Sequence, residues 1–177
     1  MKVLAQYSIP FRELDNSDHE YNFTVSDSFF KCFENSEIFG SDIEVKLILS
    51  KKSCSLDLNI SLCGKVKIKC DRCLEEYYED INFNDNIGVE FGDETNFDTN
   101  EDYVILDRNA NEINISQFVF EFAHFALPLV HYHPNDKDGK SGCNPKMIEA
   151  LQKYSDPKRI KKADPRWEKL QEIKNKM

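Results

Sequence analysis

The fold is decided by the stretch SCSLDLNISLCGKVKIKCDRC, residues 53–73. From 54 to 62 every even position is apolar or cysteine and every odd position is polar, and after Gly64 the apolar positions are again even. Alternation with a period of two is typical of antiparallel strands that bury one face. We therefore expect two strands that form a hairpin around Gly64, with a Cys-x-x-Cys turn, Cys70 to Cys73, where the second strand ends.

Further short strands are expected on both sides of this hairpin. They are predicted at 3–11, 20–25 and 42–50, once or twice within 74–91, and from Tyr103 onward. Helices are predicted after Ser26, through 118–127 as a buried helix that ends at Pro128, over 145–154, and from Pro165. This order predicts an α+β fold: an antiparallel, curled sheet or partly closed barrel packed against a buried helix, with short C-terminal helices. We expect one β-rich domain, 1–150, and a basic helical tail, 151–177.

The net charge of -9 is unevenly distributed along the chain. Residues 71–102 contain twelve acidic residues and one basic residue, whereas residues 151–177 contain nine basic and four acidic residues. Basic surfaces could contact a phosphate backbone while the acidic stretch faces a basic protein, or the charges could serve solubility alone. No apolar run reaches the roughly 20 residues that span a bilayer, and no export signal is recognisable, so we expect a cytoplasmic protein without membrane contact.

The cysteines suggest a metal site. Six cysteines without an export signal indicate a reducing compartment, where paired thiols serve metal or redox roles more often than disulfides. Cys70 and Cys73 have the spacing of one half of a tetrahedral zinc site. The other half would be His133 and Cys143, with His131 as a substitute ligand, if the Gly-rich loop between them folds back. Reduced thiols without metal and a redox pair remain alternatives to one structural zinc. The remaining cysteines are expected in the core: Cys32, Cys54 and Cys63.

A second candidate site is the basic face of the opening stretch, which comprises Lys65, Lys67, Lys69 and Arg72. Neighbouring lysines would lie about 6.6 Å apart at the usual strand rise. That spacing suits contacts with nucleic-acid phosphates that do not read the base sequence. The alternative is a solvated outer strand face. No nucleophile–base pattern, identifiable carboxylate pair or phosphate-binding glycine loop is recognisable, so we expect neither an enzyme nor a small-molecule substrate.

These motifs resemble those of a known family. The segment VKIKCDRCLE, residues 66–75, is similar to the basic strand and C-x-R-C-L-E signature of the YceD family, the large ribosomal RNA subunit accumulation proteins of bacteria and plastids. The segment ALPLV, residues 126–130, the later His133 and Cys143, and DPRWEKL, residues 164–170, follow in the family's order. The resemblance covers roughly residues 40–170.

The resemblance implies a non-enzymatic role in the accumulation of large-subunit (23S-type) ribosomal RNA and in the biogenesis of the 50S subunit. The residues that match the family's motifs are Cys70, Arg72, Cys73, His133 and Cys143, whereas His131 stands where relatives often carry proline. We expect contacts with ribosomal RNA or a pre-ribosomal particle, with a basic ribosomal protein, or with both. The alternatives are a zinc-stabilised protein-interaction module without RNA contact and a Cys-x-x-Cys thiol-redox protein.

Overall fold

The structure is a computed structural model that describes residues 2–97, 103–135 and 139–155. The described residues group into two compact units, each built from separate stretches of the chain. The first unit draws on residues 1–69 and 76–131, and the second draws on residues 70–75 and 132–177. The strands and the helices that cover them belong to the first unit, whereas the Cys-x-x-Cys turn belongs to the second.

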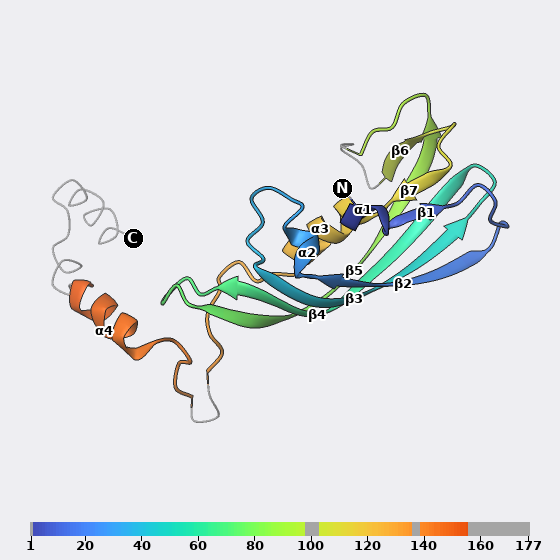
Figure 1. The fold of residues 1–177 in the computed structure, drawn as a ribbon. Helices are drawn as coiled ribbons and strands as arrows, with labels where there is room; N and C mark the ends of the chain where they lie inside the picture. The colour runs from blue at the N-terminus through green and yellow to red at the C-terminus, as the bar shows by residue number, and fades with distance from the viewer. Residues whose placement is uncertain (1, 98–102, 136–138, 156–177) are drawn as a thin grey trace, which may run out of the picture. The chain divides into compact units, whose positions relative to one another are not determined.

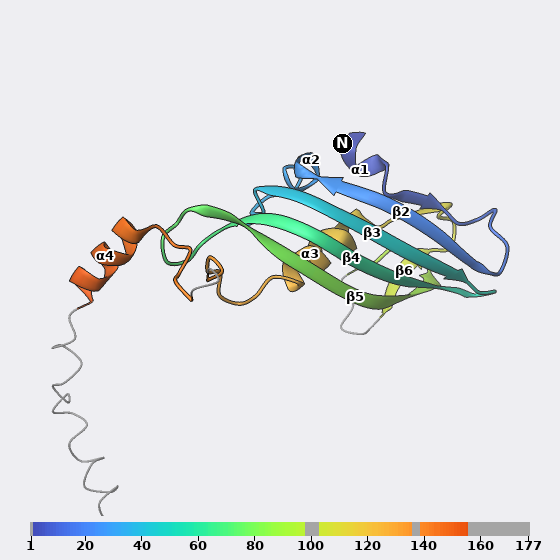
Figure 2. The same cartoon turned by 90° about the horizontal axis from the view of Figure 1, so that it is seen from below.

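A five-stranded sheet forms most of the first unit (Figures 1 and 2). Its strands stand side by side in chain order: β2 (Asp18–Ser26), β3 (Gly40–Lys51), β4 (Ser55–Lys69), β5 (Glu76–Gly92) and β6 (Tyr103–Asp107). The strands β2 to β5 pair antiparallel with their neighbours, as predicted. The α+β class is confirmed.

The edge strand β6 departs from the predicted antiparallel sheet, because it pairs parallel with β5. Strand β5 ends at Gly92, and Tyr103 begins to pair at the level of Gly88, before the end of β5. A chain that returns in this way enters the neighbouring strand in the same direction. The sheet is therefore mixed. Within the described residues it has two edges, β2 and β6, so it is not a closed barrel, and the curled sheet or partly closed barrel stays a prediction.

Strand β4 is one continuous strand of 15 residues, so the predicted hairpin around Gly64 is wrong. Gly64 pairs with Ile43 on one side and Ile81 on the other, without a turn. The apolar positions stay even through Gly64, and an unbroken phase keeps one face of a single strand inward. Glycine is needed there because a β-carbon would lie 2.7 Å from the Cα of Ile43. The true hairpin joins β4 to β5 through residues 70–75.

The core of the first unit lies on the face to which the even-numbered residues of β4 point. Six of its side chains have no exposed surface: Leu56, Leu58, Ile60, Leu62, Val66 and Ile68. Burying each such side chain contributes roughly 1.5–3 kcal/mol of transfer free energy. Helix α3 (Ser116–Phe125) packs against β4 and β5, and helix α2 (Asp27–Phe30) packs against β2 and β3, on one face of the sheet (Figure 1). The predicted buried helix is therefore present, although Phe125 at its end is 67% exposed.

The first predicted strand, 3–11, is only partly present. Residues Lys2–Ala5 form a short helix, α1, and only Ser8–Pro10 form a strand, β1. Strand β1 pairs with β7 (Glu112–Asn114) in a separate two-stranded sheet. Pro10 ends β1, as expected of a residue that has no N–H to donate. This short pairing brings the segment after β1 next to the turn before β7.

In the second unit, residues Pro145–Tyr154 form the predicted short helix, α4. The Asn144 side chain accepts a hydrogen bond from the Lys146 N–H at 3.0 Å, a typical N-terminal cap. The predicted domain boundary at residue 150 falls inside α4, and the predicted helix from Pro165 lies outside the described residues. Of the helices in the described part of the chain, none has the length and apolar character needed to cross a bilayer.

Candidate metal centre

The turn after β4 holds the first two thiols. The Cys70 N–H donates to the Glu75 carbonyl at 2.9 Å, and the Leu74 N–H donates to the Cys70 carbonyl at 2.9 Å. Leu74 has a φ of 62°, a left-handed conformation that residues other than glycine adopt mainly in tight turns. These features close residues 70–75 into a compact loop that keeps Cys70 and Cys73 together.

The second pair of ligands comes from the loop 133–143. The Gly142 N–H donates to the Pro134 carbonyl at 3.2 Å, and Asn135 pairs with Ser141 as an isolated bridge. A β-carbon at position 142 would lie 2.8 Å from the Pro134 carbonyl oxygen, so glycine is what lets the two sides of the loop approach each other. The loop thus folds back, as the zinc hypothesis required.

Cys70, Cys73, His133 and Cys143 converge within the second unit, and their ligand atoms all lie within 4.8 Å of one another. The Sγ atoms of Cys70 and Cys143 are 3.6 Å apart, and the Sγ of Cys73 is 3.4 Å from the Nδ1 of His133. Tetrahedral zinc, with Zn–S of about 2.3 Å and Zn–N of about 2.0 Å, places two sulfurs about 3.8 Å apart and a sulfur and a nitrogen about 3.5 Å apart. These two pairs therefore match tetrahedral zinc closely, and the residues present fit a zinc ion.

Burial makes the thiols the core of the second unit. Cys70, Cys73 and Cys143 are 0%, 3% and 4% exposed. Among the described residues of this unit, no other side chain is buried, and α4 buries none of its residues. A small unit that buries so little apolar surface needs another source of stability, and a bound metal ion is a common one. The burial pattern therefore supports a structural metal.

The two thiols of the turn differ in proton affinity. Burial would raise the pKa of Cys70, but hydrogen bonds from the backbone of Cys73, Arg72 and His133 outweigh it and lower that pKa to about 6. Burial raises the pKa of Cys73, and the sulfur of Cys70 raises it further. Cys70 is thus a thiolate at neutral pH beside a protonated Cys73, and a metal ion would bind the first and displace the proton of the second.

Residues around the ligands hold them in place. The Nδ2 of Asn144 donates to the Oε1 of Glu75 at 2.6 Å, which ties the start of α4 to the Cys-x-x-Cys turn. The Arg72 guanidinium lies 5.2 Å from the centroid of the Tyr132 ring. Sequence reasoning did not single out Gly142 or Asn144. The available signal was the run GCNP, residues 142–145, in which a close-approach glycine, a ligand and a helix cap follow one another.

The other histidine and cysteine predictions have mixed outcomes. The converging group contains His133 and does not contain the substitute ligand His131. The remaining cysteines, predicted in the core, are exposed instead: Cys32, Cys54 and Cys63. Cys63 occupies an odd, outward-facing position of β4, and Cys54 lies in the turn before that strand. Cys63 is thus exposed because it points outward from β4, whereas Cys54 is in phase with the buried face but lies outside the strand.

The basic face of β4 is exposed, but its charges are shared with neighbouring groups. The Nζ of Lys65 lies 3.6 Å from Asp80, and the Nζ of Lys67 lies 2.6 Å from Glu76. Hydrogen bonding to Glu76 raises the pKa of Lys67, and the same contact lowers the pKa of Glu76. Antiparallel pairing places the acidic strand β5 beside these lysines. RNA contact by this face stays a prediction.

Lys69, the third lysine of this face, lies over an aromatic ring. Its Nζ is 4.7 Å from the centroid of the Phe39 ring, a distance at which a cation is attracted to the face of the ring. Because this contact is between a cation and an uncharged ring, it does not cancel the charge of Lys69 as a carboxylate would. The three lysines therefore do not form an uninterrupted row of unpaired charges.

Comparison with known proteins adds one match. The family model described as "Large ribosomal RNA subunit accumulation protein YceD" matches residues 58–174, which is more than half of the chain. The matched region contains all four converging ligands. No curated protein and no solved structure matches the chain.

Proposed function

Because the chain belongs to the YceD family, we propose that it is a non-enzymatic cytoplasmic factor in the accumulation of large-subunit (23S-type) ribosomal RNA and in the biogenesis of the 50S subunit. The family match over residues 58–174 is the observation that carries this proposal. The ligand geometry agrees with a role other than catalysis. Four protein ligands leave no open position on a tetrahedral zinc ion, which is the pattern of structural rather than catalytic sites.

The proposed partners are ribosomal RNA or a pre-ribosomal particle and a basic ribosomal protein. Strand β5 and the residues after it carry exposed acidic side chains that form no ion pair with a described residue: Asp85, Glu90, Asp93 and Glu94. Exposed carboxylates suit a basic protein, because opposite surface potentials steer partners together and fix their orientation. The RNA contact needs a basic surface, for which the basic face of β4 is the candidate predicted from the sequence.

Depletion of the protein tests this function directly. The expected result is a lower ratio of 23S-type to 16S-type RNA and fewer 50S subunits in a sucrose gradient, both restored by the intact chain supplied in trans. The Cys63→Ser variant supplied in trans is the control and should restore both as the intact chain does, because Cys63 is exposed and lies outside the ligand set. An unchanged RNA ratio after depletion would remove the proposal.

A second candidate function is a zinc-stabilised protein-interaction module without RNA contact. The convergence of Cys70, Cys73, His133 and Cys143 favours it. Metal analysis of protein purified without chelator should find one zinc per chain, lost in Cys70→Ser and in Cys143→Ser. Protein without metal that forms a reversible Cys70–Cys73 disulfide near cytosolic potentials would instead favour a thiol-redox protein.

A further inference from the structure

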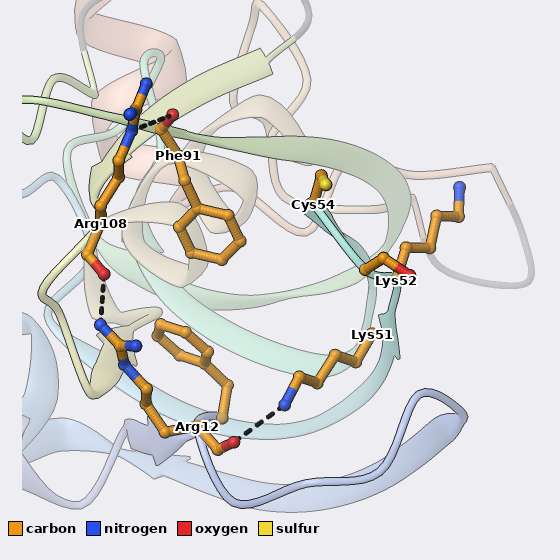
Figure 3. A pocket seen from close by; sticks show the side chains of 8 residues that line it. Arg12, Lys51, Lys52, Cys54, Phe91 and Arg108 are labelled. Carbon is orange, nitrogen blue, oxygen red and sulfur yellow. Dashed lines mark hydrogen bonds between the residues drawn. The ribbon is translucent and has the colours of Figure 1, made fainter.

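A pocket in the first unit collects basic side chains that the proposed function has not used (Figure 3). Its volume is about 500 Å³, within the range of about 300–1,000 Å³ that is typical of small-ligand sites. It lies between the segment after β1, the turn from β3 to β4, the end of β5 and the turn after β6. Four lining residues are basic: Arg12, Lys51, Lys52 and Arg108. Among the described residues that line it, none is acidic.

Backbone carbonyls hold two of these cations in place. The Nε of Arg12 donates to the Ala110 carbonyl at 3.0 Å, and its Nη2 donates to the Arg108 carbonyl. The Nζ of Lys51 donates to the carbonyls of Arg12 and Leu14 at 2.9 and 2.7 Å. A neutral carbonyl fixes the position of a cation and leaves its net charge in place, whereas a carboxylate would cancel it. Arg12 and Lys51 are thus pre-positioned charges.

Arg108 is a third basic residue whose charge no carboxylate of a described residue cancels, whereas Lys52 is not. The Nε of Arg108 lies 3.5 Å from the Phe91 carbonyl oxygen, so its two Nη groups keep their donors for a ligand. Lys52 pairs with Asp57, and Figure 3 shows its side chain directed away from Phe91. Among the described residues, no carboxylate forms an ion pair with Arg12, Lys51 or Arg108. Three uncancelled cations therefore surround the pocket.

Two aromatic rings form its apolar wall. The centroids of Phe11 and Phe91 are 5.7 Å apart, with the rings tilted by 34°. Figure 3 shows the Phe91 ring inside the pocket, with Arg12 and Arg108 on one side and Lys51 on another. Guanidinium groups bind phosphate with paired hydrogen bonds, and unstacked RNA bases stack on aromatic rings. Cations around a ring are therefore the chemistry that a nucleotide requires.

We infer that this pocket, rather than the basic face of β4, is the main contact of the protein with single-stranded RNA. Neighbouring phosphates of the strand lie against Arg12, Arg108 and Lys51, one against each cation, and a base lies against Phe91. The groups that face the basic side chains decide between the pocket and the basic face of β4. Lys65 and Lys67 each face a carboxylate of β5, whereas the three pocket cations face carbonyls. The inference rests on the proposed function, since it names where that function touches RNA.

Fluorescence anisotropy with a labelled single-stranded RNA tests the inference on the full chain. An RNA of about 12 nucleotides falls within the site sizes of about 4–16 found for single-strand binders. The double variant Arg12→Gln/Arg108→Gln should lose affinity by about tenfold or more at low salt. The slope of log affinity against log salt should fall by about 1.4, since each lost phosphate contact on a single strand removes about 0.7. The control Lys31→Gln/Lys46→Gln carries the same change of charge in the first unit and should bind as the intact chain does.

Two competitors identify the ligand. AMP should displace the RNA at lower concentration than inorganic phosphate does, because AMP adds a base that can lie against Phe91. Equal displacement by both would overturn the base contact. Tighter binding of the RNA than of AMP supports a strand as the ligand, and tighter binding of AMP would overturn RNA in favour of a free nucleotide.

Loss of binding in Lys65→Gln/Lys67→Gln/Lys69→Gln, with binding kept in the double pocket variant, would overturn the inference in favour of the basic face. Absence of RNA binding by the intact chain would overturn it as well. If the double variant does not fold, Arg108→Gln alone takes its place, because the one side-chain hydrogen bond that Arg108 makes with a described residue is long, at 3.5 Å. A slope lowered by about 0.7 then supports the pocket, and an unchanged slope overturns it.

Depletion separates failure of the pocket from failure of the function. If depletion lowers the 23S-type RNA and the double pocket variant restores it fully, the pocket inference fails and the proposed function stands. If depletion leaves the RNA ratio unchanged, the proposed function fails whatever the pocket binds.

Discussion

Loss of one ligand should open the second unit and leave the first intact. The perturbation is Cys143→Ser, which replaces a buried thiol at the candidate metal centre by a hydroxyl that is a poor zinc ligand. The matched control is Cys63→Ser, at an exposed position of β4. Because Cys70, Cys73 and Cys143 are the only buried side chains among the described residues of the second unit, little else there opposes opening.

The size of the effect follows from mass action. A metal ion that binds only the closed unit stabilises it by about 2.7 kcal/mol when the free ion is held at about 100 times its dissociation constant. This energy corresponds to a roughly 100-fold smaller open population, and amide exchange through that opening slows by the same factor.

Hydrogen exchange followed by mass spectrometry measures this difference segment by segment. In buffered zinc, peptides covering 70–75 and 139–155 should exchange about 100-fold more slowly than after chelation, whereas a peptide covering 56–68 should not change. Cys143→Ser should behave as the chelated protein does, and Cys63→Ser as the intact one. Unchanged exchange of 139–155 after chelation, or one zinc retained by Cys143→Ser, would refute the reasoning.

Three further outcomes test the fold and the site. Gly64→Ala should lower the free energy of unfolding by about 1–3 kcal/mol in urea denaturation, because the new methyl meets the backbone of β3. Gly92→Ala, whose methyl would meet only the Cγ2 of Ile105, should cost less, and equal losses would contradict the close approach at Gly64. Leu58→Ala should cost about 2–5 kcal/mol in the same assay, because Leu58 has no exposed surface; a neutral result would place Leu58 outside the core. Zinc affinity, measured by competition with a chelating dye, should rise at least about tenfold per pH unit near neutrality, because Cys73 with its raised pKa must release a proton. It should fall more steeply below about pH 6, where Cys70 also becomes protonated; an affinity that is flat across this range would contradict both pKa shifts.

Most of the sheet could be predicted because its strands alternate. The predicted segments 20–25 and 42–50 lie within β2 and β3, since side chains that bury one face leave a period of two in the sequence. The alternation does not by itself show where the chain turns. Only the phase of the alternation, in which the apolar positions stay even on both sides of Gly64, would have shown that Gly64 lies inside a strand. The direction of β6 was beyond prediction, because a short alternating strand reads the same in parallel and antiparallel pairs.

The metal centre could be predicted further than the pocket. Cys70 and Cys73 lie in one turn, so their spacing alone identifies half of a site. The approach of Cys143 depends on the fold-back at Gly142, which the glycines of the loop permitted but did not require. Arg12 and Arg108, by contrast, are 96 positions apart and meet because β1 pairs with β7. No local pattern in the sequence indicates that meeting.

The separation of the ligands along the chain has a consequence for the order of folding. Cys70 and Cys143 are 73 positions apart, and at about 5–20 residues per second a ribosome takes roughly 4–15 s to pass from one to the other. During that interval β5, β6 and α3 are synthesised. The thiols of the Cys-x-x-Cys turn therefore exist before the complete set of ligands does. If a metal ion fills this centre, a nascent chain acquires it late, and its first two thiols are open to oxidation or to a wrong metal until then.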